Sequence, residues 1–287
     1  MNNGSLFKQV TIVGVGLIGG SLGMAIKKHH LAEEVVGLSP HHSSLAYALE
    51  SKAIDRGLHD IQKAVEAADL VIMATPVKTI ISLLPMISKH LKRGAVVTDV
   101  GSIKTTIVDT AERHFSSAFF VGSHPLAGSE KAGAVFANPN LFQHSLCIVT
   151  PTPKTNRLAE EKVRSLWESL GATVKTLTPS EHDKILAFIS HLPHLLAYAL
   201  IDVIPGEYLP YAASGLKDTT RIAASSPNMW NDICMTNSKN IVQTLDEVVK
   251  KLSLFRKLIL AKAEENLIET FKKAKIKRES LDQTPKA

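Results

Sequence analysis

A glycine-rich turn near the N-terminus constrains the fold more than any other feature of this chain: Gly14-Val15-Gly16-Leu17-Ile18-Gly19. The residues before it are rich in β-branched side chains and predict a strand, and the residues after it predict a helix. In that context Gly14 permits a tight turn, Gly16 lets the backbone approach a pyrophosphate, and Gly19 lets helix and strand pack closely. The free N–H groups where the helix starts, around Leu17 and Ile18, favour phosphate groups. The loop therefore predicts a dinucleotide-binding domain.

The position that usually contacts the cofactor ribose is unusual. An NAD site commonly has Asp or Glu at the end of the second strand, but here the strand predicted over 34–38 ends at Ser39, followed by Pro40, His41 and His42. No carboxylate and no arginine occurs between residues 35 and 49. Nothing there would repel a 2′-phosphate, and Ser39 or the histidines could donate to one. The sequence leaves NAD and NADP open, with NAD as the default.

Short apolar strands alternate with helices through the first half of the chain. Strands are predicted over 69–74, 95–100, 119–122 and 145–150, and helices over 44–52, 78–91 and 104–114. This alternation predicts a doubly wound, mainly parallel Rossmann-type sheet. Ligands bind such sheets beyond the carboxyl ends of the strands. We therefore expect the residues that end two of these strands to border the nicotinamide, namely Thr75 and Pro76 after the first, and Gly101 and Ser102 after the second.

The pattern changes after about Thr176, where strand signals stop. Helices are predicted over 180–203, 208–224, 229–263 and 264–277, the first preceded by the helix-start pattern Thr178-Pro179-Ser180-Glu181. An apolar stripe over 242–260 at helical spacing is typical of a core or a subunit interface. We predict a dinucleotide-binding domain over 1–176 and an all-helical substrate and dimerisation domain over 177–287.

Composition excludes several other classes of protein. The two cysteines, Cys147 and Cys234, form no CxxC pair, which argues against structural zinc and a disulfide scaffold and favours a reducing cytoplasm. Of the net charge of +6, the tail over 270–287 supplies +4, as expected for a solvated helix end rather than a nucleic-acid surface. The uncharged stretch 10–26 contains five glycines and is short for a membrane span. We expect neither a nucleic-acid nor a membrane partner.

One histidine is placed to do acid–base chemistry. His124 follows a short predicted strand and lies in a Gly/Pro-rich loop, where a rigid turn would position it. Imidazole changes protonation near neutral pH, so it suits removal of a proton from a hydroxyl that is being oxidised. His191 and His194 share a helix face, but no carboxylate or cysteine at ligand spacing accompanies them, so we predict no metal site.

Five sequence blocks, in this order, resemble the prephenate/arogenate dehydrogenase family: GVGLIGGS, DVGSIKT, GSHPLAGSEKAG, SHLPH and GLKDTTRIAASSPNMWNDI. The resemblance runs from about residue 9 to about residue 260. It implies an oxidoreductase of tyrosine biosynthesis that oxidises and decarboxylates prephenate with NAD(P)+ to 4-hydroxyphenylpyruvate, or arogenate to tyrosine. It also implies a homodimer formed through the helical domains. Because the glycine loop begins at Gly14 and the sequence ends at Ala287, we expect a monofunctional enzyme.

The resemblance also implies roles for individual residues. His124 would accept the proton of the ring hydroxyl, and Ser102 would orient that hydroxyl. Arg221 would bind a substrate carboxylate, which suits a planar guanidinium. Other substrate contacts would come from a second histidine, a tryptophan lining the ring pocket, and two polar residues after the catalytic loop, the acidic one orienting or gating the site: His194, Trp230, Ser129 and Glu130.

Two alternative functions share some of these features. A β-hydroxyacid dehydrogenase would have the same architecture but needs a catalytic lysine on the helical domain, for which Lys217 is the candidate. A nicotinamide-binding redox sensor could use the basic tail on nucleic acid, but it leaves His124, Arg221 and Trp230 without a role. The sequence does not separate prephenate from arogenate, and direct inhibition by tyrosine stays open.

Overall fold

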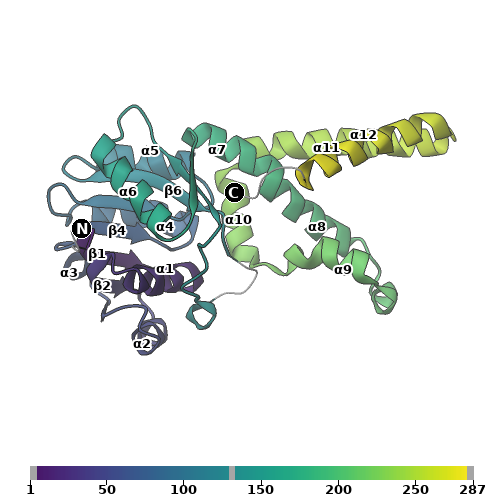
Figure 1. The fold of residues 1–287 in the computed structure, drawn as a ribbon. Helices are drawn as coiled ribbons and strands as arrows, with labels where there is room; N and C mark the ends of the chain where they lie inside the picture. Colours follow the sequence, from purple (N-terminus) through teal and green to yellow (C-terminus); the bar gives the residue numbers. More distant parts are fainter. Residues whose placement is uncertain (1–4, 129–132, 283–287) are drawn as a thin grey trace.

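The first part of the chain forms an eight-stranded sheet sandwiched between helices (Figure 1). The structure, a computed structural model, describes residues 5–128 and 133–282. Strand order is β3-β2-β1-β4-β5-β6-β7-β8, and every neighbouring pair is parallel except β6 and β7. The predicted doubly wound, mainly parallel sheet is confirmed. The strands are β1 (Phe7–Val13), β2 (Ala32–Leu38), β3 (Arg56–Leu58), β4 (Leu70–Met73), β5 (Val96–Asp99), β6 (Phe119–Pro125), β7 (Leu146–Thr150) and β8 (Thr173–Thr176).

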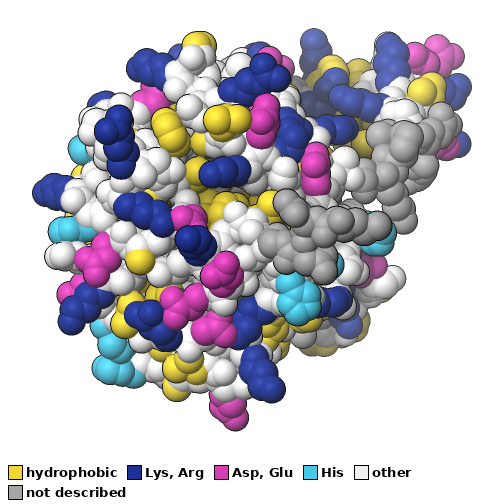
Figure 2. Space-filling view, turned by 60° about the vertical axis from the view of Figure 1, so that its left-hand side comes forward, with side chains coloured by type: hydrophobic (Ala, Val, Ile, Leu, Met, Phe, Trp, Pro, Cys, Tyr) yellow, Lys and Arg dark blue, Asp and Glu magenta, His cyan; other side chains and the backbone are white. Residues whose placement is uncertain are grey.

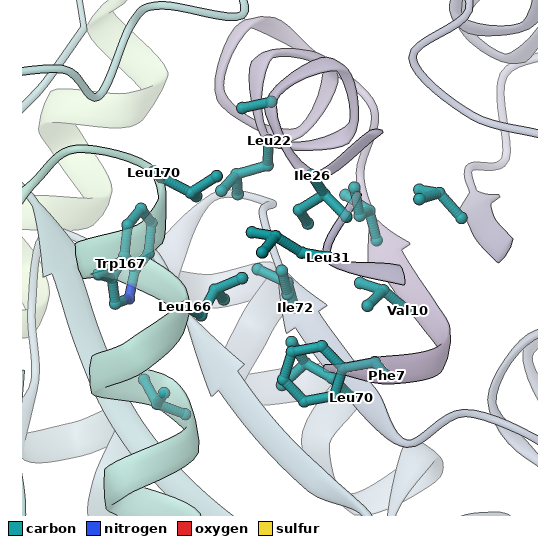
Figure 3. Packing of buried hydrophobic residues seen from close by; sticks show 14 of the residues in the cluster. Phe7, Val10, Leu22, Ile26, Leu31, Leu70, Ile72, Leu166, Trp167 and Leu170 are labelled. Atoms are coloured by element: carbon teal, nitrogen blue, oxygen red, sulfur yellow. The ribbon is translucent and has the colours of Figure 1, made fainter. Parts of the chain in front are cut away.

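Two hydrophobic cores, one on each face of the sheet, hold this domain together. On one face Leu22, Ile26 and the fully buried Trp167 belong to one cluster, which also contains Val10 and Ile72 (Figure 3). Each such side chain contributes roughly 1.5–3 kcal/mol by leaving water. Helices α1 (Leu17–Lys28), α2 (His42–Glu50) and α6 (Arg157–Ser169) cover this face, and α3 (Ile61–Val65), α4 (Val77–Ile87) and α5 (Thr105–His114) cover the other.

The second part of the chain is all helical and extends away from the sheet (Figure 1). It begins at a capping box: Thr178 Oγ1 accepts from the Glu181 N–H at 3.2 Å, and the Glu181 carboxylate accepts from the Thr178 N–H at 2.9 Å. The helix start predicted from the sequence is thus confirmed. The helices are α7 (Pro179–Leu186), a π-helical turn (Ala187–His191), α8 (Leu192–Asp202), α9 (Ser214–Thr220), α10 (Pro227–Thr236), α11 (Ser238–Leu260) and α12 (Glu264–Asp282), with 3-10 turns at Gly206–Tyr211 and Arg221–Ala224. A further 3-10 turn, Ala134–Phe136, lies between β6 and β7 in the sheet domain.

Two predicted helices are broken where the sequence suggested continuity. The segment 208–224 forms three short pieces, with Pro210 inside the first. The segment 229–263 breaks at Asn237, which lies between α10 and α11 and is buried. Its side-chain amide donates to the backbone carbonyl of Asp183 at 2.8 Å. A tertiary hydrogen bond therefore outweighs local helix propensity at this position.

The helical part docks on the carboxyl ends of the strands. Helix α7 packs on α5 and α10 on α4, and Lys78 of α4 lies 3.0 Å from Asp232 of α10. The continuous run Pro179–Asp202 has the length and apolar composition that a membrane-crossing helix needs, a test that a core helix also passes. On the face shown in Figure 2, acidic and basic side chains are interspersed over the sheet domain.

The contacts of α7 and α10 with the sheet domain leave a seam between the two domains. The candidate site lies in this seam.

Candidate active site

A cavity of about 450 Å³ opens at the seam between the domains. The strand ends supply Ser102 and His124, and the helical part supplies His194, Arg221 and Trp230. The structure therefore brings together five side chains that lie up to 128 positions apart in the sequence (102 to 230). The two other predicted substrate contacts, Ser129 and Glu130, lie outside the described residues.

His124 is the first of three side chains that are joined by hydrogen bonds. It lies near the end of β6, where β7 pairs with it, and is partly buried. Its Nδ1 is 2.8 Å from Nε2 of His182, whose own Nδ1 is 2.8 Å from Oδ1 of Asp183. His182 is fully buried and Asp183 nearly so. Both partners come from α7, so the helical domain completes the environment of a histidine held by the sheet.

The hydrogen bonds that join His124, His182 and Asp183 select the tautomer of His124. The Asp183 carboxylate can only accept, so Nδ1 of His182 carries the proton, and Nε2 of neutral His182 is an acceptor. Nδ1 of His124 must then donate to that acceptor, which leaves Nε2 of His124 as an unprotonated lone pair. A histidine in this form is a base ready to accept a proton. The arrangement supports the proton-accepting role predicted for His124.

Asp183 is held by the other domain. It accepts from the backbone N–H groups of Lys104 at 2.7 Å and Thr105 at 2.9 Å, at the start of α5. Burial alone would raise the pKa of Asp183, but the hydrogen bonds from His182, Thr105 and Lys104 outweigh burial and hold the pKa below its ordinary value. The carboxylate therefore stays ionised, as its accepting role requires.

A fully buried ion pair lies beneath the site. The Lys104 ammonium contacts the Asp99 carboxylate and also donates to the Ser123 carbonyl at 2.7 Å. The carboxylate of Asp99 further accepts from the N–H groups of Gly101 at 2.8 Å and Ser123 at 3.2 Å. Burial pushes the pKa of Asp99 up and that of Lys104 down, and the charge of each partner opposes that shift in the other. The pair ties the two loops that carry Ser102 and His124 to one another.

The far wall of the cavity is an aromatic layer. The ring of His194 stacks on Trp230 with centroids 3.9 Å apart, and His191 meets the same indole edge-on at 6.0 Å. Nδ1 of His194 lies 2.9 Å from the carbonyl of Ser190, so it carries a proton and leaves Nε2 available. The π-helical turn Ala187–His191 precedes α8 here, and such turns are frequent at functional sites.

A second cavity, of about 610 Å³, follows the glycine loop along the strand ends. Its wall includes five residues that were predicted to contact the cofactor, from three loops: Gly14 and Gly16, Ser39, and Thr75 and Pro76. Gly14 has a φ of +93°, and a side chain there would meet the Ala74 carbonyl, whereas a side chain at Gly16 would enter open space. That opening leaves the backbone accessible to a pyrophosphate. The Thr75 hydroxyl at this wall is buried and finds no hydrogen-bond partner among the described residues.

Four other predicted cofactor residues do not line this cavity. A side chain at Gly19 would lie 1.9 Å from the Gly14 carbonyl, so Gly19 serves close packing. Gly101 is buried and donates to Asp99, and the first-turn residues Leu17 and Ile18 are partly exposed. The residues present nevertheless fit a dinucleotide, because the turn, the open backbone and the helix start occur together.

Comparison with known proteins agrees with this geometry. The family model for the nucleotide-binding domain of prephenate dehydrogenase matches residues 22–176, and that for its dimerization domain matches residues 178–273. The chain belongs to the prephenate dehydrogenase family. It is similar to prephenate dehydrogenase of Bacillus subtilis, with 36% identity over 95% of this chain and 76% of the relative. It is also similar to cyclohexadienyl dehydrogenase of Zymomonas mobilis, with 32% identity over 96% of this chain and 97% of the relative.

The similarity to a solved structure covers nearly the whole chain. The Aquifex aeolicus prephenate dehydrogenase in complex with hydroxyphenyl propionate and NAD+ superposes with a TM-score of 0.90 at 35% identity, covering 96% of this chain and 98% of that one. Members of the family are NAD-dependent oxidoreductases with a nucleotide-binding domain, and this chain is one of them.

The surroundings of His124 also determine its protonation state. Burial first, and then His182, Lys104 and His191, lower the pKa of His124 well below 6.5. Burial likewise lowers the pKa of His182, although the hydrogen bond to Asp183 opposes the effect. His124 is therefore neutral at pH 7, as a proton acceptor must be.

Several residues of the site have little or no signal in the sequence. His182 and Asp183 carry a signal only in retrospect, since a neighbouring histidine and aspartate follow the capping box directly. Lys104 lies inside the DVGSIKT block but was not singled out, and Asn237 had no signal. Lys217, which the β-hydroxyacid alternative needs as a catalyst, is exposed and does not line the cavity. Among the described residues, no three His, Cys, Asp or Glu side chains are grouped to hold a metal ion.

Proposed function

We propose that this chain is a prephenate dehydrogenase that converts prephenate, with NAD(P)+, to 4-hydroxyphenylpyruvate and CO2. In this reaction a hydride leaves the ring carbon that bears the hydroxyl, and the hydroxyl proton leaves with it. The bond to the ring carboxylate then breaks and CO2 leaves. Its electron pair makes the ring aromatic, and the ring oxygen takes up a proton again to become the phenol hydroxyl. The observation that carries the proposal is the hydrogen-bonded series His124–His182–Asp183, which leaves Nε2 of His124 as an acceptor, at a cavity shared with Ser102 and Arg221.

Each of these side chains has one task. His124 accepts the hydroxyl proton at Nε2, and the resulting positive charge is stabilised through His182 by the Asp183 carboxylate. Ser102 orients the hydroxyl, and Arg221 binds a substrate carboxylate in bidentate fashion. A bound nicotinamide supplies the hydride acceptor, and the loop at Gly14 and Gly16 would hold its pyrophosphate.

The described part of the cavity lining, which does not include Glu130, suits a keto acid better than an amino acid substrate. Arogenate differs from prephenate by an ammonium group in place of a ketone, and a buried ammonium needs a carboxylate or several acceptors. None of the described residues that line the cavity is Asp or Glu. This supports prephenate as the main substrate and arogenate as the alternative.

A two-by-two assay tests this function. Prephenate or arogenate is mixed with NAD+ or NADP+, and the absorbance of the reduced nicotinamide is followed. We expect turnover with prephenate, and we expect His124→Asn to lower kcat by about three orders of magnitude, as for loss of a general base, with cofactor affinity retained. His29→Asn, at an exposed histidine that ends α1, is the matched control. Near-normal turnover of His124→Asn, or no turnover in any mixture by folded protein that binds the cofactor, would refute the proposal.

We also propose that the chain forms a homodimer through its helical domain and works in a reducing cytoplasm. Several apolar side chains of α11 are 55–68% exposed in the single chain: Val242, Val249, Leu252, Ile259 and Leu260. Surfaces of this kind are normally covered by a partner, and the match to the dimerization domain supports a second copy. The two cysteines are free thiols. Sedimentation should give the mass of two chains.

A further inference from the structure

His191 lines the substrate cavity at the domain seam but has no part in the proposed proton transfer. It is the last residue of the π-helical turn Ala187–His191 and is buried. Burial lowers its pKa to about 4, and the charges around it nearly cancel, since Asp183 raises the pKa while His182 and His194 lower it. His191 is therefore neutral at pH 7 and carries a single ring proton.

Asn237 determines which nitrogen of His191 carries that proton. The side-chain Nδ2 of Asn237 donates to the Asp183 carbonyl at 2.8 Å, and its Oδ1 accepts from Nδ2 of Asn240 at 2.7 Å, so the orientation of the amide is fixed. The same Nδ2 lies 3.2 Å from Nδ1 of His191. Because an amide nitrogen only donates, Nδ1 of His191 must accept, and the proton lies on Nε2.

Two N–H donors therefore lie together at this wall of the cavity. The bond to Asn237 is the only hydrogen bond that the His191 ring makes within the described part of the chain, so its Nε2–H is unpaired there. Nε1 of Trp230 is buried and also finds no partner among the described residues. The two rings meet edge-on with centroids 6.0 Å apart, and both residues line the cavity. Since buried N–H groups are nearly always paired, two unpaired donors here indicate an acceptor on the bound molecule.

The substrate of the proposed function carries two carboxylates. Arg221 is the only Lys or Arg among the described residues that line the cavity. A guanidinium suits a carboxylate that keeps its charge, whereas the ring carboxylate leaves as neutral CO2. An ion pair to the leaving group would stabilise the substrate more than the transition state and would slow the reaction. Neutral donors can hold the ring carboxylate with a smaller penalty.

We propose that Nε2–H of His191, oriented by Asn237, binds the ring carboxylate of prephenate, with the indole N–H of Trp230 as a second donor. The inference rests on the proposed function and adds a residue that distinguishes the dicarboxylate substrate from its monocarboxylate product. The ring carboxylate and the hydroxyl are on opposite carbons of the ring, which matches His191 on the helical domain and His124 on the sheet domain. Arg221 then binds the side-chain carboxylate, which the product keeps.

Two substitutions of His191 separate a donor from a structural role. His191→Leu removes the ring and its N–H, whereas the amide of His191→Gln places an N–H at the position of Nε2. Both variants lose the acceptor for Asn237, so the donor is the main difference between them. We expect His191→Leu to raise KM for prephenate about tenfold or more, with a smaller change in kcat, as for a lost hydrogen bond to a charged group. His191→Gln should keep KM within about threefold of wild type.

The reaction product supplies a second comparison. 4-Hydroxyphenylpyruvate lacks the ring carboxylate, and calorimetric titration of the NAD+-saturated protein gives its dissociation constant. In His191→Leu this constant should stay within about threefold of wild type. An unchanged KM for prephenate, equal weakening of prephenate and product, or the same loss in both His191 variants would overturn the inference.

Melting curves monitor folding of the variants. If His191→Leu does not fold, Trp230→Phe decides, because it keeps an aromatic ring and removes the second donor. It should raise KM for prephenate about threefold or more and leave the affinity for 4-hydroxyphenylpyruvate unchanged, and an unchanged KM would overturn the inference. Absence of turnover of prephenate by the folded wild-type protein would instead refute the proposed function itself.

Discussion

Replacing Asp183 by Asn should weaken the catalytic base while removing only one charge. Oδ1 of Asp183 accepts from His182 and from the Lys104 N–H, and Oδ2 accepts from the Thr105 N–H. An amide has one oxygen, so in either orientation its NH2 group faces one of these two backbone N–H groups. With the oxygen at Oδ1 the tautomer of His124 is kept, whereas in the other orientation the amide donates to Nδ1 of His182 and leaves a proton on Nε2 of His124.

The size of the effect follows from the hydrogen bonds involved. Either orientation gives His182 a neutral partner in place of a carboxylate and sets the amide N–H against a buried backbone N–H. A buried hydrogen bond to a charged group is worth roughly 1.5–3 kcal/mol, and an unsatisfied buried donor costs a similar amount. A net penalty of about 3 kcal/mol corresponds to a loss of about two orders of magnitude in kcat. Cofactor affinity should not change, because neither residue lines the nucleotide cavity.

Two measurements check this prediction. Steady-state kinetics give kcat, and the ¹⁵N shifts of the His124 ring report which nitrogen carries the proton. Asp202→Asn, at the end of α8 and exposed, is the matched control and should behave as wild type. The ring shifts show which orientation the amide adopts, and the reasoning is refuted if folded Asp183→Asn keeps kcat within a few-fold of wild type.

Two further predictions concern stability and substrate binding. Burial lowers the pKa of His191 from 6.5 to about 4, so the unfolded chain takes up a proton that the folded chain refuses, and stability is lost as pH falls from about 6.5 toward 4. Urea denaturation gives the free energy of unfolding at pH 7.5 and at pH 5. Between these two pH values His191→Gln should lose roughly 2 kcal/mol less of this free energy than wild type; an equal loss would contradict this. Arg221→Lys keeps the charge but not the bidentate geometry, so KM for prephenate should rise about tenfold or more with a smaller change in kcat, whereas Lys217→Arg should change neither; an unchanged KM would remove Arg221 from the carboxylate site.

Much of the nucleotide domain was predictable because its signals are local. The glycine loop, the apolar runs of β4 and β5 and the capping box at Thr178 each depend on residues a few positions apart. Short β3 was missed, since three residues carry no periodicity, and so was α6, whose buried Trp167 is revealed only by the core it fills. Helix 229–263 was too long in the prediction because its break at Asn237 depends on a tertiary hydrogen bond. Helix 208–224 was too long because it was drawn through Pro210.

The site divides in the same way. His124, Arg221 and Trp230 were found because they lie in sequence blocks that resemble a known family, and the structure places all three on one cavity. His182 and Asp183 were not, because their significance lies in distances to residues about 60 to 80 positions away. Hydrogen-bond direction, which decides the tautomer of the base, is a property of the assembled fold and has no counterpart in a linear pattern.

The contact of Asp183 with the start of α5 makes chemical competence depend on domain docking. A fragment that ended near Thr176 would keep the glycine loop, the nucleotide cavity and His124, yet it would lack the acceptor that selects the reactive form of the imidazole. Such a fragment could bind a nucleotide without being able to draw a proton from a hydroxyl. The reactive tautomer of His124 therefore forms only when the helical domain is folded against the sheet domain. Proton abstraction is thereby restricted to the fully folded protein.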